Sequence, residues 1–125
     1  QHIGKEGDLL VKVGDSVLKG QPLTQYHTSL SLPVHASTSG VVTAIEPRTG
    51  CHPSGLPELS IVIKPDQKDT WIEHSGITNY QELSAEELVN VIRQAGISGM
   101  GGAGFPTARK LQSGFGRIDI LIINA

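Results

Sequence analysis

Short apolar runs separated by turn residues fill the first half of the chain. Residues 9–13 (LLVKV) end at a Gly-Asp pair, residues 41–45 (VVTAI) follow the turn-rich segment 36–40 (ASTSG), and residues 59–63 (LSIVI) end at Lys-Pro. Runs rich in β-branched residues and closed by Gly, Asp, Ser or Pro are typical of strands. No window before residue 66 keeps a helical period for three turns. The pattern therefore predicts an all-β domain over residues 1–66.

The period changes after a polar connector, residues 67–78. Ser84 and Glu87 have the spacing of a capping box at a helix N-terminus, and Leu83 and Leu88 are placed to form the hydrophobic staple beside it. Gly96 is placed to end this helix in a left-handed conformation. The apolar residues that the helical period puts on one face are Leu88, Val91, Ile92 and Ala95.

A glycine-rich loop, a short helix over residues 107–113 and a strand over residues 118–123 complete the pattern. A helix, a loop, a helix and a strand in this order predict the start of an α/β domain over residues 79–125. The expected fold class is therefore α+β, with an all-β domain first and the opening of an α/β domain second. The chain begins at Gln1 and ends after a strand without a successor, so we expect it to be a fragment.

Composition narrows the class of protein. Ten basic and twelve acidic side chains give a net charge of −2, which does not favour nucleic acid or a polybasic membrane contact. The longest apolar stretch, residues 120–123, is too short to span a bilayer. The lone Cys51 excludes a disulfide framework or a cysteine-held cluster made by this chain alone. No metal-ligand spacing links the five histidines, which are His2, His27, His35, His52 and His74.

Two segments of the β domain repeat a strand, a tight turn and a returning strand. They are residues 13–23 (VGDSVLKGQPL) and 33–42 (PVHASTSGVV), and the pair resembles the biotinyl/lipoyl-type barrel-sandwich hybrid. In carrier members of that family a modified lysine lies eleven positions before the glycine that matches Gly40, and here that position is Ser29. A serine hydroxyl cannot form the amide link, so we expect a scaffold or docking surface. The alternative is that these glycines serve hairpins of an unrelated β domain.

The glycine-rich loop, residues 98–107 (SGMGGAGFPT), carries the clearest chemistry. Four glycines in six positions let the backbone approach a ligand, and consecutive amides in such a loop bind anions. A helix that begins near Thr107 adds its positive end, and Lys110 in its first turn is explained by a bound phosphate. The loop also matches G-x-G-x-x-G, but no strand precedes it and Asn124 stands where an acidic residue is required. An ordinary Rossmann site is therefore disfavoured, and a Walker loop is excluded because Gly-Lys-Ser/Thr does not follow at the required spacing.

A longer string, residues 101–107 with Lys110 and the closing Asn124-Ala125, resembles the flavin site of the NADH-oxidising flavoprotein subunit of respiratory complex I. It is closer still to the C subunit of the Rnf electron transport complex, in which a barrel-sandwich unit also precedes the loop. The resemblance implies binding of FMN, oxidation of NADH and electron transfer to 4Fe-4S clusters in a later part of the subunit. The residues that it assigns to FMN are Gly101, Gly102 and Gly104 through backbone, Lys110 at the phosphate and Asn124 at the flavin.

The resemblance also has departures and consequences. Complex I usually has arginine where this chain has Met100, and we assign Phe105 and Pro106 mainly to loop shape, with core packing an equal alternative for Phe105.

The parent protein is expected to be a peripheral subunit at the cytoplasmic face of the bacterial inner membrane, with other complex subunits as partners. This chain alone is expected to be inactive and to bind FMN weakly or not at all. Two alternatives remain open, which are a docking module without cofactor and a phosphate binder without redox chemistry.

Overall fold

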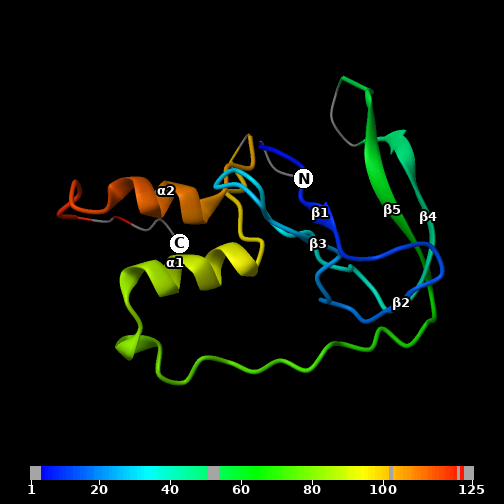
Figure 1. The fold of residues 1–125 in the computed structure, drawn as a ribbon, viewed down its shortest axis with the longest axis horizontal. Coiled ribbons are helices and arrows are strands. Elements are labelled where there is room, and N and C mark those ends of the chain that lie inside the picture. The colour runs from blue at the N-terminus through cyan, green and yellow to red at the C-terminus, as the bar shows by residue number, and fades with distance from the viewer. Residues whose placement is uncertain (1–3, 51–53, 102, 121, 123–125) are drawn as a thin grey trace. The chain divides into compact units, whose positions relative to one another are not determined.

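The computed structural model describes residues 4–50, 54–101, 103–120 and 122 (Figure 1). The chain forms two compact units. One, the β unit, consists of residues 9–25 and 34–75, and the other, the helical unit, contains the described residues of 1–8, 26–33 and 76–125. The chain therefore leaves the β unit at residue 26 and returns at residue 34. This division differs from the linear boundaries at residues 66 and 78, which stay a prediction about domains.

The β unit is built from short strands and one long hairpin. β1 (Asp8–Leu9) pairs with β3 (Thr24–Gln25) as a two-stranded sheet. β2 (Ser16–Val17), β4 (Gly40–Thr49) and β5 (Pro57–Pro65) form a three-stranded sheet with β4 in the middle, and both pairings are antiparallel. Figure 1 shows β4 and β5 as the long hairpin. The prediction of an all-β first unit is confirmed, although the described residues form no closed barrel.

Aliphatic side chains fill the core of the β unit, as the scarcity of aromatic residues requires. Along β4 the buried Val42 lies between the exposed Val41 and Thr43, which is the alternation expected of a strand with one covered face. One extra residue interrupts this alternation, because Val42 pairs with Ile63 whereas Ala44 pairs with Val62. This is a β-bulge. The buried core consists of Val11, Val17, Leu23, Ala36 and Val42, with Ile45, Ile61 and Ile63 packed against it.

The two turn motifs of the sequence meet at the start of β4. Gly14 N donates to the Val42 carbonyl at 2.8 Å, and Val42 N donates to the Asp15 carbonyl at 2.9 Å. Gly40 has φ = 157°, and a Cβ at this position would overlap the carbonyl oxygen of Lys64 on β5. The glycine that matches the carrier family is therefore required by the close approach of two strands.

The polar segment that follows β5 is tied to the β unit up to residue 75. Lys19 N donates to the Thr70 carbonyl and Ile72 N donates to the Lys19 carbonyl, at 2.9 and 3.0 Å. Ser39 joins the same segment, since its Oγ donates to Asp66 Oδ1 and accepts from Thr70 N at 2.8 Å. These hydrogen bonds attach residues 66–72 to the rest of the β unit, so this segment is part of that unit.

The helical unit contains a 3₁₀ turn, η1 (Tyr80–Glu82), and two helices that pack against each other, α1 (Ala85–Gln94) and α2 (Thr107–Gly114). The predicted capping box is confirmed, since Ser84 Oγ accepts from Glu87 N and Ser84 N donates to Glu87 Oε2 at 2.7 Å. Gly96 follows the helix with φ = 69°, as predicted. The short second helix is also confirmed.

One prediction for the helical unit is right in part and one is wrong. Leu88 and Ile92 of the expected face of α1 are half-buried, but the buried residue is Val89, and Val91 and Ala95 are exposed. The covered side of α1 differs from the apolar face because the polar residues Asn90 and Arg93 also contact Tyr26. Hydrophobic periodicity takes no account of such polar contacts. Residues 118, 119, 120 and 122 form no strand, and residues 121 and 123 lie outside the described residues. A strand needs the backbone hydrogen bonds of a partner strand, and no strand in the described part of the chain pairs with these residues.

Candidate anion site at the glycine-rich loop

The glycine-rich loop is closed at its base by backbone hydrogen bonds. Ser98 and Pro106 form an antiparallel bridge. Inside it Gly99 N donates to the Phe105 carbonyl at 2.9 Å, and outside it Thr107 N donates to the Ile97 carbonyl at 3.1 Å. The loop therefore starts and ends at one place, and α2 begins directly after it.

Several amides of the loop have no partner among the described residues. Apart from its chain neighbours, no atom lies within 4 Å of the position that a Cβ of Gly101 would occupy, and Gly104 has the left-handed φ of 60°. Unpaired loop amides around a space without side chains are the donors of an anion-binding nest. The N–H groups that donate to no partner within the described part of the chain belong to Met100, Gly101, Ala103, Gly104 and Phe105.

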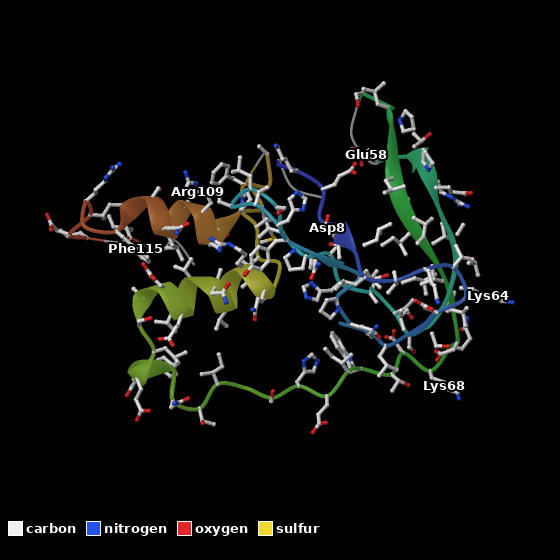
Figure 2. All side chains as sticks on the ribbon, in the orientation of Figure 1. Asp8, Glu58, Lys64, Lys68, Arg109 and Phe115 are labelled. Carbon is white, nitrogen blue, oxygen red and sulfur yellow. The ribbon has the colours of Figure 1, made fainter. Side chains whose placement is uncertain are left out.

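The start of α2 adds positive charge beside the loop. Its N-cap residue is Pro106, no side chain caps the first turn, and no acidic residue lies in it. Arg109 and Lys110 are instead exposed in this turn (Figure 2 labels Arg109). Cations at a helix N-terminus oppose the helix dipole, so their presence here is unfavourable unless an anion compensates the charge.

The sequence-predicted site residues fall into two groups. Gly101 and Gly104 lie in the loop and Lys110 lies on the first turn of α2, so the structure brings these three into one region. Gly102 and Asn124 lie outside the described residues, so the roles assigned to them stay predictions. Pro106 is fully buried at the start of α2, and Phe105 keeps 38% of its surface exposed.

Sequence reasoning missed two contributors to this region. Arg109 is a second cation beside Lys110, and the adjacent basic pair at the start of a predicted helix was the signal that could have found it. Tyr26 also contacts α1 from the segment between β3 and the second half of the β unit. No local pattern links Tyr26 with a helix 64 residues later, so sequence spacing could not reveal this contact.

The position of a carrier lysine is occupied by an ordered turn. Ser29 is exposed, and next to it Ser31 is buried, with its Oγ accepting from His27 N at 3.0 Å and from Thr28 N at 2.9 Å. Lys19 of the first turn motif pairs with Asp69 and lies 4.8 Å from the centre of the Trp71 ring. This pairing lowers the pKa of Asp69, mainly through the hydrogen bond from Lys19.

Neither a metal centre nor a membrane-spanning helix is seen in the described part of the chain. Within residues 4–50, 54–101, 103–120 and 122, no three His, Cys, Asp or Glu side chains gather into a group that could hold a metal ion. No helix among these residues has the length and apolar character needed to cross a membrane.

The paired turn motifs, the aliphatic core and the close strand contact at Gly40 are consistent with a barrel-sandwich hybrid. Residues 1–68 match the family described as RnfC barrel sandwich hybrid domain, and the chain belongs to this family. Over its 125 residues it is 68% identical to the C subunit of the ion-translocating oxidoreductase complex of Vibrio cholerae serotype O1. It is 55% and 57% identical to the subunits of the same name from Serratia proteamaculans and Edwardsiella ictaluri. All of the chain is covered in each comparison.

The chain spans 16% of the length of the Vibrio and Edwardsiella relatives and 18% of the Serratia relative. The resemblance to the C subunit of the Rnf complex, inferred from the order of the two motifs, is confirmed by these matches.

Proposed function

We propose that the chain is part of the C subunit of an ion-translocating electron transport complex and that its glycine-rich loop holds the phosphate of FMN. The observation that carries the proposal is the group of five loop amides that have no partner among the described residues and lie directly before the start of α2, which no side chain caps. Backbone N–H groups and a helix N-terminus together favour a phosphate over a neutral ligand.

The loop glycines and the basic residues of α2 have different roles in the proposed site. Gly101 and Gly104 would contact the cofactor with bare backbone, because a side chain at either position would narrow the loop. Lys110 would pair with the phosphate, and Arg109 lies next to it as a second cation. By family resemblance, Gly102 would line the cofactor and Asn124 would hydrogen-bond the flavin ring. Bound FMN supplies the chemistry that joins two-electron oxidation of NADH to one-electron transfer to 4Fe-4S clusters.

The wider role is also a proposal, because most of each relative lies outside the part that this chain matches. The relatives are named as subunits of an ion-translocating oxidoreductase complex, so we propose the other subunits of such a complex as partners. Peripheral attachment at the cytoplasmic face of the bacterial inner membrane fits this assignment. The rest of the protein would complete the flavin pocket, so the 125-residue chain alone should show no NADH oxidation and weak FMN binding.

Titration of the full-length subunit with FMN tests the phosphate role. Lys110→Ala should weaken FMN binding by about 10-fold or more, since a charge-assisted hydrogen bond is lost. The matched control is Lys68→Ala, which removes an exposed lysine of the β unit and should leave the dissociation constant unchanged (Figure 2). Equal affinities of Lys110→Ala and wild type would contradict the assignment. Tight binding of any nucleotide without preference for flavin would favour a generic phosphate site, and no binding would favour a docking module.

A further inference from the structure

The segment of residues 26–33, here called the arm, leaves the β unit and belongs to the helical unit. It is ordered by the Ser31 turn, and both Ser31 and Leu32 are buried, with exposed fractions of 0% and 1%. The tip of a carrier hairpin has to reach distant sites, so buried side chains argue against that role. The arm is therefore a packed part of the helical unit.

Tyr26 at the start of the arm holds α1 in two ways. Its hydroxyl donates a hydrogen bond to Asn90 Oδ1 at 2.7 Å, and its ring centre lies 5.3 Å from the guanidinium carbon of Arg93. Asn90 and Arg93 are three residues apart on α1, so both lie on the same side of the helix. One side chain of the arm thus satisfies two polar groups of α1.

Arg93 extends the contact to the second helix. Its Nη2 donates to Gln112 Oε1 on α2 at 3.3 Å. Its Nε is buried and has no hydrogen-bond partner among the described residues, and the guanidinium lies over the Tyr26 ring in a cation–π contact. Tyr26, Arg93 and Gln112 therefore form a continuous link from the arm through α1 to α2.

This link spans the two helices that flank the glycine-rich loop. α1 ends at Gln94, the loop closes at the bridge between Ser98 and Pro106, and α2 begins at Thr107. Any change in the packing of α1 against α2 must be absorbed by the short loop between them. We propose that Tyr26 is a positioning residue, which fixes the pair of helices through Asn90 and Arg93 and thereby holds the loop amides in a ligand-ready arrangement. For its effect on flavin this proposal rests on the function proposed above.

Amide hydrogen exchange of the 125-residue chain tests the link without any ligand. The readout is the protection of the Gly99 and Thr107 amides, whose hydrogen bonds close the base of the loop. Tyr26→Leu should lower this protection about 10-fold, and Tyr26→Phe, which keeps the ring over Arg93 but loses the hydrogen bond to Asn90, should lower it about 3-fold. Tyr80 is the chain's other tyrosine and is 56% exposed, so Tyr80→Leu is the matched control and should change nothing.

FMN titration of the full-length subunit gives the second measurement. Tyr26→Leu should weaken binding about 10-fold and Tyr26→Phe about 3-fold, whereas Tyr80→Leu should bind like wild type. If Tyr26→Leu fails to fold, Tyr26→Phe alone decides, and wild-type protection and affinity in that variant would overturn the proposal. Unchanged protection in Tyr26→Leu would overturn it too, even if Lys110→Ala abolishes FMN binding. If Tyr26→Leu lowers the protection but the wild-type subunit binds no FMN, the proposed flavin site is wrong and the positioning role of Tyr26 is still supported.

Discussion

Replacing Gly40 by alanine tests the packing of the β unit at its tightest point. Gly40 opens β4 opposite Pro65 of β5, and its Cβ position overlaps the carbonyl oxygen of Lys64 and lies 3.0 Å from the Pro65 Cα. All of these neighbours are backbone atoms, so no flexible side chain can move aside. Gly14 offers a matched control, because it also has a positive φ, 98°, but no atom lies within 4 Å of its Cβ position.

The two variants differ in the steric clash of the new Cβ with the backbone of β5, which only Gly40→Ala introduces. A non-glycine residue in a glycine-only backbone region costs about 1–3 kcal/mol, and the gain from a stiffer unfolded chain offsets about 0.4–1 kcal/mol of it. Gly14→Ala should therefore lower the free energy of unfolding by about 1 kcal/mol. Gly40→Ala adds the cost of forcing two strands apart, which is about 1–3 kcal/mol for an overpacked site. We expect a loss of about 2–4 kcal/mol, a large share of the stability of a small domain.

The lone tryptophan makes the measurement direct. Trp71 belongs to the β unit, where its ring lies 3.0 Å from the Cβ position of Gly20, so its fluorescence reports unfolding of this unit. At an m-value of about 1–2 kcal/mol per molar urea, the two variants should differ in urea midpoint by on the order of 1–2 M. Equal midpoints would refute the reasoning, since they would mean that β5 does not approach the start of β4 as closely as the structure has it.

Three further variants test separate features. The hydrogen bond from Lys19 lowers the pKa of Asp69. The contribution of Asp69 to stability is therefore complete above the unfolded-state pKa and is lost as the pH falls through the folded-state pKa. The urea midpoint of wild type should drop below about pH 4, and Asp69→Asn should reduce that drop. A steeper drop in the variant would contradict this. Ser84→Ala removes the N-cap of α1 and should cost about 1 kcal/mol in thermal unfolding followed by helical circular dichroism; an unchanged melting temperature would show that the capping box adds nothing. Val89→Ala should cost about 2 kcal/mol in the same assay, whereas Val91→Ala at an exposed position should cost below about 0.5 kcal/mol, and the reverse order would restore the face expected from periodicity.

Features encoded within a few residues could be predicted from the sequence. The capping box needs only Ser84 and Glu87, and the end of α1 needs only Gly96, so both are visible in the sequence itself. The alternation along β4 is equally local. The helix start beside the loop was also predicted, because the loop glycines and Lys110 form one short segment, whereas the roles of these residues toward a cofactor stay predictions.

Features that depend on distant partners could not be predicted. The covered side of α1 depends on Tyr26, 64 residues earlier, and hydrophobic periodicity gives no weight to a hydrogen bond between tyrosine and asparagine. The expected strand over residues 118–123 failed for a related reason, since apolar alternation makes a strand possible but only a neighbouring strand stabilises it. Alternation alone also gave no sign of the extra residue in β4.

That extra residue decides which side chains of the long hairpin face the interior. If every residue of β4 were paired, side chains would alternate from Val42 onward, and Ala44 and Glu46 would point toward the aliphatic core. With Thr43 left unpaired, the alternation restarts, so that Ile45 packs against the core and Glu46 stays exposed. Leaving Thr43 out of the ladder therefore keeps a carboxylate in water and places an isoleucine against the core. Pairing Thr43 as a regular strand residue would exchange the two faces along the rest of β4, whereas deleting it would leave them as they are.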